Sequence, residues 1–314
     1  MNVEIPDISI CMVSFNAADY LENCLRSLYE NAPGRSFEVV IVDNASSDDS
    51  VKIIRERFPS VRLIRNSENT GFVKANNAAI RASKGRYVLC LNTDTAVLPD
   101  ALDALCKFME SHPEAGACGP RLLNVDHTTQ HQCKRGFPTV PTVLAYYLRL
   151  HKLFPQNRFF GHYLLTYLDE NLINEVESLS GAAMMVRRSV IETVGMMDED
   201  YFMYMDDIDW CYRIKQARWK VYYVPDAQIL HFGGRSTRKV VYKSLVHFYK
   251  SQAIFYRKHY AVYHYGLINS CVYAGISMLM FAGLTVNFLR RNKVVGIRRP
   301  ERGHKKTGEP LDRV

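Results

Sequence analysis

The feature that most constrains the fold is an alternation of short apolar runs and helical patterns in the first third of the chain. The mainly apolar runs, each followed by polar or turn residues, lie at 8–15, 37–42, 61–65 and 86–91. Such runs are typical of buried parallel strands. Strands that alternate with helices predict right-handed βαβ units, and therefore an α/β protein with a mostly parallel sheet. With 314 residues, the chain can hold one large domain of this kind and an appendage.

Polar residues follow three of these predicted strands. They are Asn16 after the first, Asp43 and Asn44 after the second, and Asn92 and Asp94 after the fourth. Ligands of open α/β sheets bind beyond the carboxyl ends of strands, so the set predicts a ligand site there. Turn chemistry would explain each residue singly.

The sequence argues against two kinds of nucleotide site. The dinucleotide fingerprint G-x-G-x-x-G does not follow the first strand, which argues against an NAD enzyme, and the Walker A pattern does not occur. Strand-end carboxylates and a metal could still hold a nucleotide. The net charge is +8, but residues 290–314 carry nine Lys/Arg and three acids, which leaves +6 in this tail. Because the basic residues are not interleaved with aromatics through the fold, we predict no nucleic-acid binding.

The eight cysteines show no paired spacing, and several lie in apolar runs. We therefore expect buried, reduced thiols in a cytosolic domain. The N-terminal residues have neither a basic region nor a long apolar stretch, so we expect no secretory signal.

An acidic cluster lies within an aromatic frame at residues 201–213, YFMYMDDIDWCYR. We expect a helix from about Asp206 to Ala217, on which Asp209 and Arg213 would form a structural ion pair. Asp206 and Asp207 would lie in its first turn, where backbone N–H groups stabilise negative charge. Helix capping alone would explain one acid. Two adjacent acids beside aromatic residues favour a functional role.

A histidine, His231, follows a strand expected at 221–224 and a further apolar stretch, and it precedes Gly-Gly-Arg-Ser. A lone histidine is more often structural. This one is better explained as a ligand beside a mobile loop that could close on a phosphate.

Seven motifs together resemble a family 2 glycosyltransferase of the GT-A fold (Rossmann-like), in its rhamnosyltransferase-like bacterial branch. They are VSFN (13–16), VDNASSD (42–48), NTGFVKANN (69–77), LNTDT (91–95), SGAAMMVRR (180–188), YFMYMDDIDWCYR (201–213) and HFGGRS (231–236). They occur in the family's order and cover roughly residues 8–240.

The resemblance implies a role for each matching position. Asp43 would recognise the base or ribose, and Asn16, Asn44, Asn76 and Asn92 would contribute to nucleotide-sugar binding. Asp94 would bind Mg²⁺ or Mn²⁺ on the donor diphosphate, His231 would be its second protein ligand, and Arg235 would touch the diphosphate. Asp207 would be the catalytic base and Asp206 its acidic neighbour. Here Asn92 replaces the first acid of the Asp-x-Asp pattern, and Asp206 is shorter than the family's Glu.

The aromatic- and proline-containing stretch 121–178 is expected to be an insertion that could shape an acceptor pocket. Residues 235–259 carry seven Lys/Arg and no acid, with Lys239, Lys243, Lys250 and Arg257 on one helical face. Residues 260–289 then lack Asp, Glu, Lys and Arg. A single span would place the basic tail opposite a basic flank, so we favour an interfacial or re-entrant helical pair at the cytoplasmic membrane face. A buried helix or an oligomer contact is the alternative.

These expectations give a catalytic domain (1–236), membrane-associating helices (237–289) and a basic tail (290–314) expected to be disordered. The predicted activity is metal-dependent, inverting transfer of a sugar, L-rhamnose from dTDP-rhamnose, to a lipid-linked or growing cell-surface polysaccharide. A UDP-sugar donor, a sugar-phosphate nucleotidyltransferase and a non-catalytic membrane scaffold are the alternatives.

Overall fold

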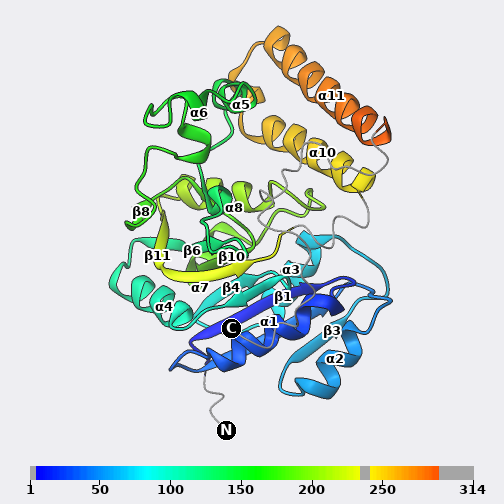
Figure 1. Cartoon of the computed structure of the whole chain (residues 1–314), viewed down its shortest axis with the longest axis vertical. Coiled ribbons are helices and arrows are strands. Elements are labelled where there is room, and N and C mark those ends of the chain that lie inside the picture. Colours follow the sequence, from blue (N-terminus) through cyan, green and yellow to red (C-terminus); the bar gives the residue numbers. More distant parts are fainter. Residues whose placement is uncertain (1–4, 234–240, 290–314) are drawn as a thin grey trace.

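A computed structural model describes residues 5–233 and 241–289 (Figure 1). The predicted diphosphate contact Arg235 and the basic tail 290–314 lie outside the described residues.

The first third of the chain folds as predicted. Its parallel strands are β1 (Ile8–Ser14), β2 (Phe37–Asp43), β3 (Arg62–Arg65) and β4 (Tyr87–Leu91). The intervening helices are α1 (Ala18–Glu30), α2 (Ser50–Arg57) and α3 (Phe72–Ala82). β1 lies between β2 and β4, so the carboxyl ends of these three strands meet at one edge of the sheet.

The second half of the sheet is mixed. It consists of β5 (Thr95–Val97), β6 (Ala115–Leu123), β10 (Ala183–Arg187) and β11 (Lys220–His231). β10 lies antiparallel between β4 and β6, whereas β11 is parallel to β6. β11 is longer than the strand predicted at 221–224, and its pairing with β6 is irregular after Val224. Pro225 lies at this irregularity, where its missing N–H cannot join the ladder. The predicted α/β class with a mostly parallel central sheet is confirmed.

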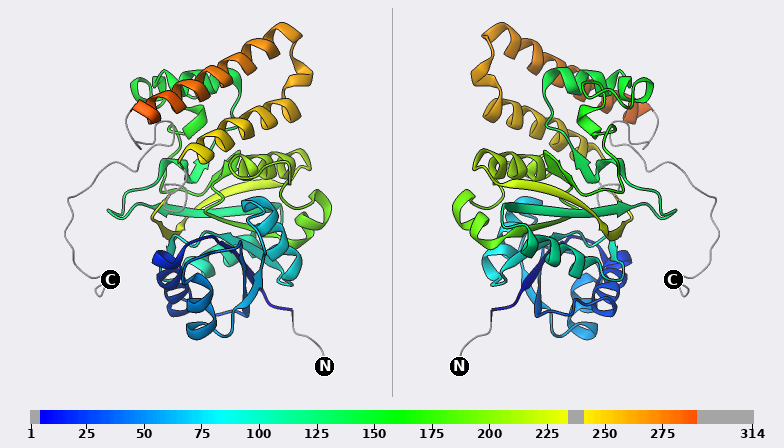
Figure 2. Two further views of the ribbon diagram at one scale, coloured as in Figure 1. Left: turned by 90° about the vertical axis from the view of Figure 1, so that its right-hand side faces the viewer. Right: turned by 90° about the vertical axis from the view of Figure 1, so that its left-hand side faces the viewer.

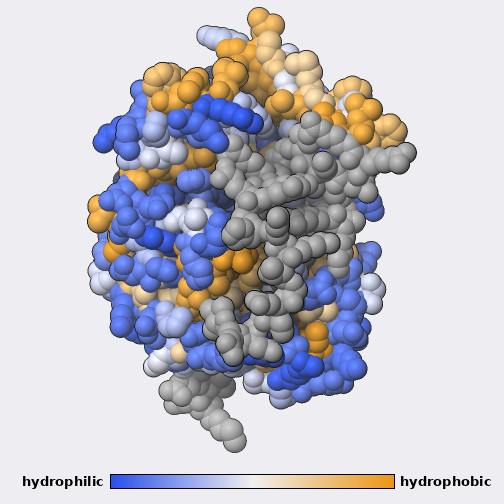
Figure 3. Space-filling view, viewed as in Figure 1, coloured by the Kyte–Doolittle hydropathy of each residue, from blue (hydrophilic) through white to orange (hydrophobic). Residues whose placement is uncertain are grey.

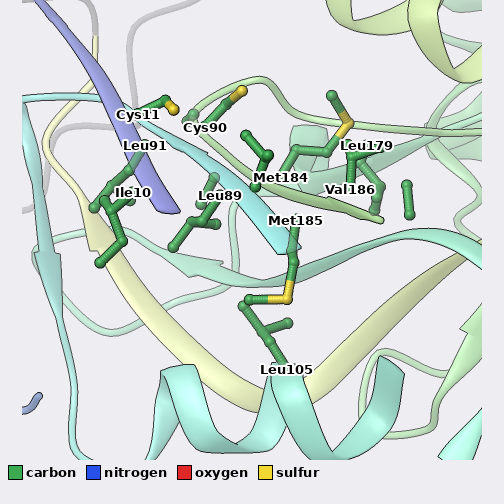
Figure 4. Packing of buried hydrophobic residues seen from close by; sticks show 14 of the residues in the cluster. Ile10, Cys11, Leu89, Cys90, Leu91, Leu105, Leu179, Met184, Met185 and Val186 are labelled. Atoms are coloured by element: carbon green, nitrogen blue, oxygen red, sulfur yellow. The ribbon is translucent and has the colours of Figure 1, made fainter. Parts of the chain in front are cut away.

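Helices cover the sheet and supply its core. They include α4 (Ala101–Ser111), α7 (Arg188–Val194) and α8 (Asp206–Gln216), the last of which confirms the predicted helix over the acidic cluster. Figure 4 shows Met185 of β10 directed at Leu105 of α4. Cys11 and Cys90 lie in the same core, and burial raises the pKa of Cys11 to about 12. Seven cysteines are buried free thiols, as predicted for such positions, and Cys271 is exposed.

An insertion leaves the sheet after β6. It contains the 3-10 turns His131–Cys133 and His162–Leu164, the helices α5 (Val140–Tyr147) and α6 (Leu150–Leu153), and the short strands β7 (Lys134–Arg135), β8 (Asn174–Glu175) and β9 (Ser178–Leu179). β7 and β9 pair as a two-stranded antiparallel ribbon, which fixes the base of the insertion.

The C-terminal region is a helical hairpin of α10 (Val241–His259) and α11 (Gly266–Leu289), joined by the 3-10 turn Ala261–Tyr263 (Figure 2). Residues 260–289, for which we predict a helical pair, hold one helix of 24 residues whose partner is α10. By length and composition α11 could cross a membrane, and it is mostly unburied. Of the four cations predicted to share one helical face, Lys243, Lys250 and Arg257 of α10 are exposed, and Lys239 lies outside the described residues.

Buried polar contacts dock α10 on the domain. His259 Nε2 lies 2.7 Å from Asp209 Oδ1, and Arg213 Nε donates to Asp209 Oδ2 at 2.8 Å. The Asp209–Arg213 ion pair is thereby confirmed. Burial opposes the charge on Asp209, but the contacts with His259 and Arg213 outweigh it and lower the pKa of Asp209. Lys258 adds ion pairs with Asp198 and Asp200.

Asn44 holds the loop between β3 and α3. Its Oδ1 accepts hydrogen bonds from Asn66 Nδ2, Thr70 N and Thr70 Oγ1 at 3.0–3.2 Å. Its Nδ2 donates to Asn69 Oδ1 at 2.9 Å and to the Gly71 carbonyl at 3.2 Å. Because the side chain is buried, loss of these bonds would leave several polar groups without hydrogen-bond partners.

We therefore expect Asn44→Ala to lower the free energy of unfolding by about 2–4 kcal/mol, because a satisfied buried network is lost. Urea unfolding measures this change. The matched control is Asn171→Ala, which removes an exposed asparagine with one side-chain contact, to Arg121. Equal losses in the two variants would contradict the role of Asn44.

Candidate active site

Two buried oxygens at the ends of β1 and β2 point to a ligand. Ser14 and Asp43 are register partners. The Ser14 Oγ and Asp43 Oδ1 atoms are buried and have no hydrogen-bond partner among the described residues, while Asp43 Oδ2 accepts from the Ser46 N–H at 3.1 Å. Because buried polar atoms are nearly always paired, these two are suited to accept hydrogen bonds from a bound molecule.

Three predicted nucleotide-sugar residues make hydrogen bonds within the protein, two of them to loops and one inside α3. Asn16, with φ of 49°, accepts from the Ser47 N–H at 2.8 Å. Asn44 holds the β3–α3 loop, and Asn76 is buried and donates to the Phe72 carbonyl at 3.1 Å. Their nucleotide-binding roles remain predictions.

Asp94 and His231 meet because β5 pairs with the end of β11. The Phe232 N–H donates to the Asp94 carbonyl at 2.9 Å, and His231 Nε2 lies 3.5 Å from Asp94 Oδ1. His231 Nδ1 lies 2.9 Å from Gln130 Oε1, while Gln130 Nε2 donates to the His231 carbonyl at 2.7 Å. The Gln130 amide oxygen can only accept, so Nδ1 donates to it, and Nε2 is the ring nitrogen that faces Asp94.

This arrangement fits a divalent cation. It offers one carboxylate oxygen and one imidazole nitrogen, with the second ring nitrogen held by an outer residue, as in many protein metal sites. Within 5–233 and 241–289, no group of three or more His, Cys, Asp and Glu side chains is placed to hold a metal. Asp94 and His231 would therefore need a ligand's own oxygens to complete a coordination shell.

The acidic pair opens α8 after a strained turn. Tyr204 and Met205 both have positive φ, 67° and 62°, which is costly for such side chains and is found at functional sites. Asp206 is buried, and this burial together with the charge of Asp207 raises the pKa of Asp206 to about 8. At neutral pH Asp206 therefore carries a proton.

Asp207 is held by three donors. Its Oδ2 accepts from Arg135 at 2.5 Å and from the Gly181 N–H at 2.9 Å, and its Oδ1 accepts from the Ile208 N–H at 2.8 Å. Arg135 supplies a positive charge, and its NH2 also donates to the Leu179 carbonyl at 3.0 Å. The two acids therefore differ in their surroundings, since burial favours the neutral form of Asp206 whereas Asp207 contacts an arginine.

Two hydrogen bonds of residues 181–182, which precede β10, connect Asp207 with the segment that carries Asp94. The Gly181 N–H binds Asp207, and the Ala182 carbonyl accepts from the Asn92 N–H at 2.9 Å. A Cβ at Gly181 would lie 3.3 Å from the Asp207 Cβ, so glycine permits this close approach. Asp94 and Asp207, far apart in sequence, thus flank one strand-end region.

Residues 9–195 match the family model of glycosyl transferase family 2. This chain belongs to glycosyl transferase family 2. The enzyme is 30% identical over 262 residues to the N-acetylglucosaminyl-diphospho-decaprenol L-rhamnosyltransferase of Mycobacterium tuberculosis, covering 79% of this chain and 83% of that one. It is 25% identical to rhamnosyltransferase WbbL of Escherichia coli, covering 76% and 88% of the two chains.

Among solved structures, the glycosyltransferase resembles a mannosyltransferase from Pyrobaculum calidifontis in complex with GDP-Man and Mn²⁺. The TM-score is 0.55 with 20% identity, covering 81% of this chain and 65% of that one, and it shows a shared fold. The family and the rhamnosyltransferase-like branch predicted from the motifs are confirmed.

Arg135, Gln130 and Ser14 were missed at the sequence level. Arg135 and Gln130 lie in the weakly periodic insertion, where sequence spacing gives no sign of contacts with residues 72 and 101 positions away. The signal for Ser14 was present, since it ends the first apolar run, but a strand-end serine is also ordinary turn chemistry.

The raised pKa of Asp206 predicts a pH-dependent stability. The unfolded carboxyl titrates near pH ~3.9, so between that value and about 8 only the folded state keeps the proton. Its contribution is fully present below the unfolded pKa and is lost as pH rises through the folded pKa. We expect Asp206→Asn to gain on the order of 2–4 kcal/mol relative to wild type between pH ~5 and ~8, measured by urea unfolding.

The control for this experiment is Asp226→Asn, which alters an exposed carboxyl of β11. This control should follow the wild-type pH profile. If Asp206→Asn also follows the wild-type profile, Asp206 does not carry the extra proton.

Proposed function

We propose that this glycosyltransferase is an inverting, metal-dependent enzyme that transfers L-rhamnose from dTDP-rhamnose to a lipid-linked acceptor or growing polysaccharide. The main support for the proposal is the pair of hydrogen bonds made by residues 181–182. They connect Asp207 with the segment of Asp94, which in turn lies beside His231. The names of the two rhamnosyltransferase relatives support the sugar and the lipid-linked acceptor.

The donor nucleotide would bind over the ends of β1 and β2. The unpaired Ser14 Oγ and Asp43 Oδ1 would accept hydrogen bonds from the base or ribose. The diphosphate would then extend toward Asn92 and Asp94 at the end of β4. Asp94 and His231 would hold Mg²⁺ or Mn²⁺, which when bound stabilises the charge that develops on the departing diphosphate.

Asp207 is the group suited to remove the acceptor proton. The acceptor hydroxyl oxygen forms a bond to the anomeric carbon, the bond from that carbon to the diphosphate oxygen breaks with its electron pair, and the hydroxyl proton passes to Asp207. Arg135 and the Gly181 N–H orient the carboxylate. Burial raises the pKa of Asp206 to about 8, so Asp206 is poorly suited to remove a proton at neutral pH.

We propose that the enzyme acts at the cytoplasmic face of a membrane. Its proposed domains are the catalytic domain (1–236), the membrane-associating helices (237–289) and the basic tail (290–314). Support comes from the apolar helix α11 and from the exposed cations Lys243, Lys250 and Arg257 of α10. Cations beside an apolar helix suit the surface of an anionic bilayer.

A nucleotide screen by thermal denaturation tests the donor class. With Mn²⁺ present, we expect dTDP to raise the melting temperature by a few degrees, since saturating ligand at about 100 Kd adds ~2.7 kcal/mol. Asp94→Ala and Gln130→Leu should reduce the Mn²⁺-dependent part of this shift, whereas Asp226→Ala should not. Stabilisation by UDP alone would replace the donor assignment, and no response to any nucleotide would favour a non-catalytic scaffold.

Asp207→Asn should keep the nucleotide-induced shift and lose about two to four orders of magnitude in turnover, because only proton removal is affected. Single-turnover transfer from a radiolabelled donor measures this loss. Near-normal transfer by the variant would exclude Asp207 as the base.

A further inference from the structure

A second apolar surface lies at the end of the molecule that carries α11. In Figures 1 and 2, α5 and α6 lie at this same end, and Figure 3 shows hydrophobic side chains gathered there. The surface comprises the apolar residues of 144–159 that are each more than half exposed: Leu144, Leu148, Leu153, Phe154 and Phe159. We call it the insertion surface.

These side chains lie outside the buried interior of the insertion, although the rings of Phe154 and Phe159 each meet that of Phe160 with centroids 5.4 Å apart. The interior is aromatic: the Tyr146 ring stacks on His151 with centroids 5.4 Å apart and meets Tyr163 edge-on at 5.0 Å. His151 and Leu164 are buried. The exposed apolar residues therefore lie on the outside of a segment that already has its own core, and large exposed apolar patches mark interaction sites.

The charge around the insertion surface indicates its partner. The inner part of the insertion, residues 127–168, contains five Lys/Arg and no Asp or Glu, and the acids of the insertion lie outside it, at 126 and 169–177. Among them, Arg149, Lys152 and Arg158 are exposed between the apolar side chains. Cations interleaved with exposed Leu and Phe suit an anionic lipid surface. A symmetric contact with a second copy would bring these cations together without a facing acid.

The insertion surface is connected to α11 through α10. Tyr147 of α5 lies beside Tyr249 and Gln252 of α10. α10 in turn packs on α11, where Tyr256 meets Tyr273 with ring centroids 5.6 Å apart. Membrane contact by one helical element would therefore bring the other to the same surface.

We propose that the insertion surface docks on an anionic phospholipid bilayer together with α11. The same insertion carries Arg135, which binds the Asp207 carboxylate, so one segment links the lipid surface to the proposed catalytic base. A lipid-linked acceptor would reach Asp207 along this segment. That last step rests on the proposed function, whereas the docking itself does not.

Vesicle co-sedimentation of the full chain tests the docking. Leu153→Glu/Phe154→Glu should lower partitioning to phosphatidylglycerol-containing vesicles by about tenfold, because two apolar contacts are replaced by charges that anionic lipid repels. The matched control is Ile5→Glu, an exposed residue just before β1, and β1 lies far from α11 in Figure 1. This variant should partition as wild type does. Thermal unfolding confirms that each variant is folded.

A second variant locates the contact directly. The fluorescence of Phe154→Trp should be quenched by brominated anionic lipid well beyond the quenching seen for Ile5→Trp. Wild-type partitioning by the double glutamate variant, or no added quenching at position 154, would overturn the proposal. A fall in oligomeric mass without any change in vesicle binding would assign the surface to a second copy instead.

The outcomes separate docking from catalysis. If the double glutamate variant partitions normally while dTDP still stabilises the enzyme, only the docking proposal fails. If partitioning falls as expected but no nucleotide binds, only the proposed function fails.

Discussion

The site depends on the antiparallel insertion of β10 between β4 and β6. This strand reverses the sheet direction at the end of β4 and brings residues 181–182 against Asn92. Gly181 then reaches Asp207 with its N–H because no Cβ intervenes. This reversal gives the metal-binding candidates and the proposed base Asp207 a shared backbone framework.

The two acids that this framework positions differ in their electrostatic surroundings. Asp206, the first residue of α8, is buried, and burial favours its neutral form. Asp207, one residue later, contacts Arg135 of the β7–β9 ribbon. Adjacent carboxylates in one helical turn repel each other, so a proton held on Asp206 relieves this repulsion.

Much of this arrangement could be predicted from sequence, because local patterns encode it. Apolar runs predicted the positions of β1, β2 and β4, and the acidic cluster predicted the start of α8. The contacts of Arg135 and Gln130 could not be predicted, since both depend on how an aperiodic insertion packs against distant strands. Asn44 shows a second limit of sequence reasoning. Its motif predicts nucleotide-sugar binding, whereas in the structure its amide makes five hydrogen bonds within the protein.

Anomalous diffraction from crystals of the full chain grown with Mn²⁺ and dTDP tests this arrangement of the site most directly. We expect a manganese peak within bonding distance of Asp94 and His231, with the nucleotide over Ser14 and Asp43 and the diphosphate facing Asp207. A manganese peak away from Asp94 and His231, or a nucleotide bound elsewhere, would contradict it.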